Sequence, residues 1–254
     1  MKVIGVVPAR MGSGRFPGKP LHPIAGRPMV EHCYERAKLY DGWDGLFLAT
    51  CDDEILTFGQ SKGWPSLMTS DHHTRALDRV AEAAGSCGID LAPDDVVVCV
   101  QADEPLLGPD VLDAVVKPFR EEPDLPGTML AMPILDEELW RNPDIVKIVH
   151  DRSDYVLYTS RAPIPYAKQF SAELGAKRVG GIFGFRWHFL QWFTETPESP
   201  LEIKEACDSN RICDNGFRQK IAEVPYRPYF SVDSPGDVAL VEAALADDPL
   251  AGKY

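Results

Sequence analysis

The sequence is short of positive charge and of long apolar runs. Its 254 residues contain 26 Lys and Arg against 39 Asp and Glu, a net charge of −13. Because a protein this acidic repels nucleic acid and anionic membranes, nonspecific binding to either is not expected. No apolar run approaches the ~20 residues of a membrane-spanning helix. The opening apolar run is interrupted at Pro8 and Arg10, unlike a signal peptide, so we expect a cytoplasmic protein.

Paired cysteines, repeats, low-complexity tracts and linkers are also missing. The six cysteines, at positions 33, 51, 87, 99, 207 and 213, have no C-x-x-C spacing. We therefore expect reduced thiols and no structural zinc site. A hydrophobic content of 44% is that of an ordinary globular protein, and the length suffices for a sizeable core. The sequence predicts a single domain over residues 1–254.

The most informative stretch is residues 3–21, V-I-G-V-V-P-A-R-M-G-S-G-R-F-P-G-K-P-L. Its uncharged start lacks alternation, which predicts a buried strand of a parallel sheet ending at Pro8. The Gly- and Pro-rich loop that follows lets backbone amides approach a ligand and carries Arg10, Arg15 and Lys19. Fixed cations and exposed amides suit a polyphosphate. The alternative is a plain strand-to-helix connection with solvated cations. The P-loop and dinucleotide patterns are both absent from this loop.

Further strands and helices alternate along the chain. Apolar runs predict strands at 46–50, 96–100 and 129–134, and helical spacing predicts helices at 28–40 and 108–121. Q-A-D-E-P, residues 101–105, directly follows a buried strand, and open α/β sheets bind ligands outside the carboxyl ends of their strands. Asp103 is therefore placed to hold a metal bound to phosphates, with a loop cap as the alternative.

The C-terminal part of the chain predicts a strand, a helix and a loose end. F-S-V-D-S-P, residues 230–235, predicts a short strand followed by a helix, with Ser234 as its cap and Pro235 in its first turn. The polar residues 246–254 are expected to be frayed.

Several segments together resemble the sugar-acid cytidylyltransferases, above all the 3-deoxy-manno-octulosonate (KDO) cytidylyltransferases, which make CMP-KDO from CTP. The segments are P-A-R-M-G-S-G-R-F-P-G-K-P-L (8–21), A-T-C-D-D-E-I (49–55), T-S-D-H-H-T-R-A-L-D-R (69–79), Q-A-D-E-P (101–105), N-P-D-I-V-K-I-V (142–149), S-R-A-P-I-P (160–165), G-I-F-G-F-R (181–186) and V-D-S-P (232–235). The resemblance implies an α/β, Rossmann-like nucleotidyltransferase fold. Its mostly parallel central sheet would have helices on both faces and a small excursion or dimerisation lobe at about 155–215.

The resemblance also implies a reaction and its residues. CMP would pass from CTP to a sugar acid with release of pyrophosphate, and Mg²⁺ would be held by Asp103 and Asp233. The implied catalytic residues are Lys19, Arg10, Asp103 and Asp233. The implied nucleotide-binding residues are Ala9, Arg10, Ser13, Arg15, Lys19, Thr50, Asp52, Arg79 and Gln101, and the acceptor-binding residues are Arg161, Phe185 and Asp208. A homodimer and a role in lipopolysaccharide biosynthesis are implied as well.

Some positions depart from the family pattern. Arg75-Ala76-Leu77 stands where the family has Ser-Gly-Thr, and Ala102 replaces a glycine. Val179 and Ser209 replace a histidine and a glutamine on the side that recognises the sugar. Because Val and Ser cannot make the same polar contacts, 8-amino-KDO, another 2-keto sugar acid or a phosphonate are alternatives to KDO. A non-catalytic nucleotide-binding relative is a further alternative, against which both aspartates and all three loop cations argue.

Overall fold

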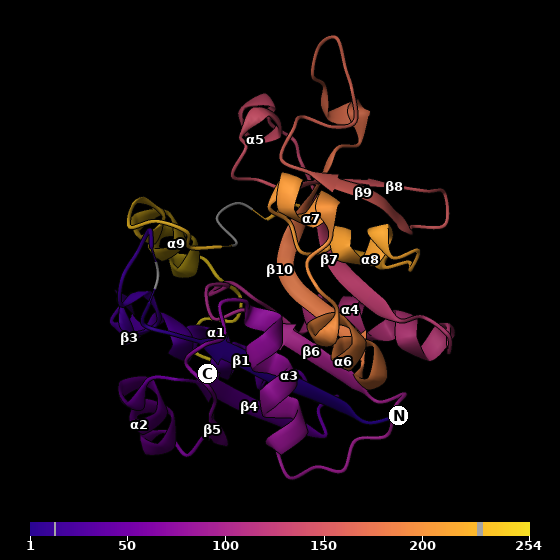
Figure 1. The fold of residues 1–254 in the computed structure, drawn as a ribbon. Coiled ribbons are helices and arrows are strands. Elements are labelled where there is room, and N and C mark those ends of the chain that lie inside the picture. The colour runs from indigo at the N-terminus through magenta and orange to yellow at the C-terminus, as the bar shows by residue number, and fades with distance from the viewer. Residues whose placement is uncertain (13, 228–230) are drawn as a thin grey trace. The chain divides into compact units, whose positions relative to one another are not determined.

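The computed structural model describes residues 1–12, 14–227 and 231–254 (Figure 1). The chain forms two compact units, unit 1 with residues 1–113 and 228–254, and unit 2 with residues 114–227. Unit 2 is larger than the excursion predicted at about 155–215. The single domain over 1–254 stays a prediction.

Unit 1 is built on a parallel sheet with strand order β6-β1-β4-β5. Its strands are Val3–Ala9 (β1), Gly45–Thr50 (β4), Ser66–Met68 (β5) and Val96–Val100 (β6). Every residue of β1 and β6 is buried, as their lack of alternation predicts. Because the strands are parallel, the segments after β1, β4 and β6 all leave from the same edge of the sheet.

The helices of unit 1 lie between its strands in the sequence and at its C-terminal end. They are Met29–Ala37 (α1), Asp53–Ser61 (α2), Ala76–Ser86 (α3) and Gly236–Ala246 (α9). Pro109–Glu121 (α4) spans the residues where unit 1 passes into unit 2. Short elements at Lys19–Leu21 (η1), Pro23–Ile24 (β2) and Arg27–Pro28 (β3) lead from the first loop into α1.

Five sequence expectations for unit 1 are wrong. β1 continues through Pro8 to Ala9, and α1 ends at Ala37 rather than near residue 40. Residues 231–233 form no strand, and α9 starts at Gly236 with Pro235 rather than Ser234 as its N-cap; Phe230 lies outside the described residues. The C-terminal end is not frayed, because Asp248 pairs with the buried Arg36.

Unit 2 combines a mixed sheet with short helices. Its strands are Gly127–Pro133 (β7), Lys147–His150 (β8), Val156–Ser160 (β9), Lys177–Arg186 (β10) and Lys220–Glu223 (β11). β7 pairs with β10 antiparallel and with β11 parallel, and β8 pairs with β9 and β10. The remaining elements are Glu137–Arg141 (α5), Ala172–Leu174 (η2), Trp187–Glu195 (α6), Pro200–Glu205 (α7) and Asn210–Asp214 (α8). β9 ends before Pro163 and Pro165, since a proline has no amide to donate to a neighbouring strand.

All six cysteines are free thiols, as predicted. Among the helices of the described residues, none combines the length and the apolar character that crossing a membrane requires.

Candidate active site

A pocket of about 420 Å³ opens in unit 1 at the edge of the sheet where β1 and β6 end. Its lining residues come from three segments: Pro8, Ala9, Arg10, Gly12, Gly14, Arg15, Lys19 and Pro20; His73, Thr74, Arg75, Ala76 and Arg79; and Gln101, Ala102 and Asp103. The volume is that of a small-molecule site. All three loop cations named from the sequence face this pocket, together with Ala9, Arg79, Gln101 and Asp103.

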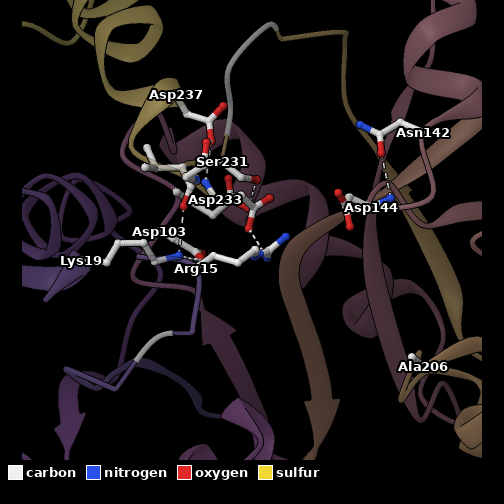
Figure 2. A network of polar contacts seen from close by, with 12 residues as sticks. Arg15, Lys19, Asp103, Asn142, Asp144, Ala206, Ser231, Asp233 and Asp237 are labelled. Atoms are coloured by element: carbon white, nitrogen blue, oxygen red, sulfur yellow. Dashed lines mark hydrogen bonds and ion pairs between the residues drawn. The ribbon is translucent and has the colours of Figure 1, made fainter. Parts of the chain in front are cut away.

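Two ion pairs bring the predicted metal ligands to the same place (Figure 2). Lys19 Nζ lies 2.7 Å from Asp103 Oδ2, and Arg15 Nη2 lies 2.8 Å from Asp233 Oδ1. The backbone joins the two segments, because the Val232 amide donates to the Asp103 carbonyl at 2.9 Å. Lys19 Nζ also donates to the Val232 carbonyl at 3.0 Å. Asp103 and Asp233, distant in the sequence, are therefore neighbours.

The electrostatics of this pair are those of two acids held close together. Burial and the Asp103 carboxylate raise the pKa of Asp233, while Arg15 and Lys19 act in the opposite direction. Two neighbouring carboxylates repel each other, and a cation between or beside them offsets that repulsion.

The first loop is held in shape by contacts to its backbone. The Met11 amide donates to Asp52 Oδ2 at 2.8 Å, and the Gly18 amide donates to the Met11 carbonyl at 3.1 Å. Gly18 has φ +73°, a left-handed conformation that a glycine adopts without strain. Arg10 Nη1 reaches the His73 carbonyl at 3.4 Å and so joins the loop to the segment before α3.

Two predicted nucleotide-binding residues bond protein groups in this structure, and their contacts with a nucleotide stay predictions. Thr50 is fully buried, and its hydroxyl accepts from the Asp52 amide at 3.1 Å. Asp52 bonds the loop backbone, and neither residue lines the pocket. Thr50 and Asp52 therefore support the loop through the Thr50 hydroxyl and Asp52 Oδ2. Ser13 lies outside the described residues.

Arg79 provides the clearest sign of a ligand in the pocket. Its side chain is 2% exposed, and Nη1 bonds Thr69 Oγ1 and the Ser70 carbonyl. Nη2 is buried and has no hydrogen-bond partner among the described residues. An unpaired buried donor is costly, so this nitrogen favours a ligand with an acceptor atom at that point.

The altered segment before Arg79 changes the pocket at two positions. Arg75 and Ala76 line the pocket, whereas Leu77 is 5% exposed and belongs to the core. Arg75 Nε donates to Asp78 Oδ2 at 3.0 Å, which fixes the direction of its guanidinium group. The departure from Ser-Gly-Thr thus adds one cation to the pocket wall.

The predicted acceptor residues all belong to unit 2. The three guanidinium nitrogens of Arg161 donate to backbone carbonyls: Nε to Glu205 at 3.1 Å, Nη1 to Pro143 at 2.9 Å and Nη2 to Ala206 at 3.1 Å. Asp208 is half-buried just before α8. The contacts of Arg161 and Asp208 with an acceptor stay predictions.

Phe185 is a correction to the predicted acceptor site. Its side chain is 1% exposed and its ring stacks near Phe189 and Phe193. A ring buried on all sides cannot touch an acceptor, so Phe185 is a core residue. The altered positions lie elsewhere: Val179 is half-buried in β10 opposite Ala131, and Ser209 is buried at the N-cap of α8.

The sequence motifs give no role to Lys147, which holds together the segments that carry Asn142 and Arg161 in unit 2. Its side chain is fully buried, and Nζ donates to the carbonyls of Asn142, Ile145 and Arg161 at 2.8, 2.6 and 2.6 Å. Burial and the charge of Arg161 lower the pKa of Lys147. A lysine inside the apolar run I-V-K-I-V is the signal that could have identified it, since lysine is seldom buried without partners.

A parallel sheet with a cation-rich pocket at the carboxyl ends of its strands defines an α/β nucleotide-binding protein. Comparisons with known proteins make the class specific. The family described as "Cytidylyltransferase" matches residues 4–221. The chain therefore belongs to the cytidylyltransferase family.

Full-length relatives and solved structures agree with this assignment. The 3-deoxy-manno-octulosonate cytidylyltransferase of Thermodesulfovibrio yellowstonii is 38% identical over 253 residues, covering 96% of this chain and 98% of the relative. That of Nitratidesulfovibrio vulgaris strain Hildenborough is 40% identical over 250 residues, covering 96% of both. A solved structure of CMP:2-keto-3-deoxy-manno-octonic acid synthetase complexed with CTP matches with a TM-score of 0.88 and 32% identity, covering 97% of this chain and 99% of that one. The predicted α/β fold with a mostly parallel central sheet is confirmed.

Proposed function

We propose that this protein transfers CMP from CTP to KDO and releases pyrophosphate. The observation that supports this most strongly is that the three loop cations and Asp103 line one pocket of unit 1, with Asp233 paired to Arg15 of that pocket. Relatives that match along almost the whole chain are KDO cytidylyltransferases. The product would be an activated sugar acid for lipopolysaccharide biosynthesis.

The loop residues would bind the triphosphate. Arg10, Arg15 and Lys19 present fixed positive charge, and the glycines leave backbone amides accessible. Of the two loop cations in these ion pairs, Lys19 is the more enclosed, with its side chain 14% exposed against 62% for Arg15, so its charge is less screened by water. These groups would neutralise the charge that builds up as pyrophosphate leaves.

The donor set of the pocket fits a magnesium ion. Within the described parts of the chain, no group of three or more His, Cys, Asp or Glu side chains is arranged to hold a metal. Mg²⁺ is usually held by one or two carboxylates together with substrate phosphates, and Asp103 and Asp233 supply two. When bound there, Mg²⁺ would orient the α-phosphate and stabilise charge on its oxygens.

Arg79 and Gln101 would bind the base. The buried Arg79 Nη2 is a donor, and cytosine offers a carbonyl oxygen and a ring nitrogen as acceptors. Gln101 lines the same pocket and carries both a donor and an acceptor. Together they would hold the nucleotide so that the α-phosphate meets the acceptor hydroxyl in line.

A different acid is the second candidate for the acceptor. Val179 and Ser209 replace residues that could hydrogen-bond the sugar, and a site without those groups discriminates differently among polar acceptors. Arg161 and Asp208 remain the proposed acceptor-binding residues, since the outer nitrogens of Arg161 each keep a further N–H.

The test is pyrophosphate release with Mg²⁺, CTP, ATP, GTP or UTP, and a panel of acceptors. The panel holds KDO, 8-amino-KDO, a sialic acid and small phosphonates. Release with CTP and KDO is expected. If CTP supports release only with another acid, that acid replaces KDO as the proposed acceptor. If CTP supports release with no acid, a non-catalytic relative is favoured.

A further inference from the structure

The turn that carries Asp233 depends on a neighbouring acid. Residues 231–235 belong to no helix or strand, so specific bonds must fix their conformation. Asp237 Oδ2 accepts from the Asp233 amide at 3.0 Å, from the Ser234 amide at 2.7 Å and from Ser234 Oγ at 3.0 Å. Figure 2 shows Asp237 beside this turn. One carboxylate oxygen thus accepts three hydrogen bonds from the turn that carries Asp233, the proposed metal ligand.

Asp237 is suited to support the turn and unsuited to bind the cation through the same oxygen. A carboxylate oxygen has two lone pairs, and three donors already surround Oδ2. Bonds from neutral donors to an ionised carboxylate are stronger than neutral bonds. Asp237 also lies in the first turn of α9, where the helix dipole stabilises its negative charge.

The other side of Asp233 is anchored independently. Val232 is fully buried in a cluster with Phe16 and Met29, and its amide bonds the Asp103 carbonyl at 2.9 Å. Its carbonyl accepts from Lys19 Nζ at 3.0 Å. Asp233 therefore follows a residue that is bonded to Asp103, and its own amide and the next one are bonded to Asp237.

We propose that Asp237 is a positioning residue that presents the Asp233 carboxylate to the divalent cation, an inference that rests on the proposed function. Groups that orient a metal ligand typically account for about 10- to 100-fold in metal affinity. Replacing Asp237 by Ala frees both amides and the Ser234 hydroxyl. Asp233 then has to be ordered when the cation binds, and affinity falls by about 10-fold or more.

The test is Mn²⁺ binding in the presence of CTP, followed by electron paramagnetic resonance. Asp237→Ala is expected to bind Mn²⁺ about 10-fold more weakly than the wild type, and Asp237→Asn, which keeps one acceptor oxygen, about threefold more weakly. The Mg²⁺ concentration for half-maximal pyrophosphate release should rise in the same order, while kcat at saturating Mg²⁺ is largely kept. Glu242→Ala is the matched control, because Glu242 lies on the same helix and bonds the Ala25 amide at 2.8 Å instead.

Two results would overturn the inference. A folded Asp237→Ala with wild-type Mn²⁺ affinity contradicts it, and if that variant does not fold, wild-type affinity in Asp237→Asn does so. Asp233→Ala separates this from the proposed function. If Asp233→Ala loses Mn²⁺ while Asp237→Ala keeps it, only the positioning role is wrong; if Asp233→Ala also keeps it, the metal site and the inference fall together.

Discussion

Arg79 shows at the scale of one residue how burial and chemistry point to a ligand. The resemblance picks this arginine from the sequence, but only the structure reveals that Nη2 is buried and unbonded in the described part of the chain. Such a donor is satisfied when a nucleotide acceptor reaches it.

Replacing Arg79 by Lys should therefore weaken CTP binding. Lysine keeps the charge but cannot supply the second guanidinium nitrogen. A hydrogen bond to a charged group contributes about 1.5–3 kcal/mol, so the dissociation constant for CTP should rise about 10- to 100-fold in calorimetry. Lys38→Ala, at the exposed C-cap of α1, is the control. Unchanged affinity in Arg79→Lys would remove Arg79 from the nucleotide site.

The sequence points to Asp52 as a residue of the site but does not reveal which group its carboxylate contacts. The motif A-T-C-D-D-E-I predicts a nucleotide contact, whereas the carboxylate bonds the Met11 amide of the loop. Phe185 shows the same limit, since a motif does not reveal whether a ring faces a ligand or the core. Residue types follow from the sequence, but the direction of a side chain depends on neighbours distant in the chain.

Removing the Asp52 carboxylate should loosen the loop without touching the nucleotide. Asp52→Ala is expected to raise KM for CTP about tenfold, because the Met11 amide loses its acceptor at a cost of about 1–3 kcal/mol. Asp52→Asn keeps an acceptor oxygen and should restore most of the affinity. Equal kinetics in Asp52→Ala and the wild type would show that the loop does not depend on this bond.

At the scale of elements, local pattern predicts the buried strands well and the C-terminal part poorly. β1 and β6 are continuous apolar runs, which hardly any other element of that length produces. Residues 231–233 have the composition of a strand, but the amides of Val232 and Asp233 bond Asp103 and Asp237 instead of a neighbouring strand. Polar residues after α9 suggest a loose end, although Arg36 and His32 hold Asp248 and Tyr254. Such long-range partners leave no local pattern.

The tie between Arg36 and Asp248 should be a large contributor to stability. The side chains are only 2% and 9% exposed, and Arg36 also donates to the Leu106 carbonyl at 3.2 Å. Asp248→Ala leaves a buried charge without its partner, which costs about 3–5 kcal/mol. The midpoint of thermal unfolding should fall by about 10 °C. The exposed Asp247→Ala should change it little, and equal midpoints for the two variants would contradict the assignment.

At the scale of the whole molecule, an acidic chain gathers its cations where an anion is to bind. The net charge is −13, yet Arg10, Arg15, Lys19, Arg75 and Arg79 line one pocket of unit 1. The fold class and this pocket follow from the sequence through the resemblance. The bounds of the two units do not, because they depend on contacts that no motif encodes. The homodimer stays a prediction, which light scattering of the purified protein would test.

The central claim is that Asp103 and Asp233 act together on CTP, and the initial rate of pyrophosphate release tests it most directly. With CTP, KDO and Mg²⁺, the wild type should turn over, and Asp103→Ala and Asp233→Ala should each lose at least about 10²- to 10³-fold in rate. Both variants should keep their circular dichroism spectrum, because the side chains of Asp103 and Asp233 are 25% and 47% exposed and neither belongs to the core. If either variant releases pyrophosphate at the wild-type rate, the account of the site is wrong.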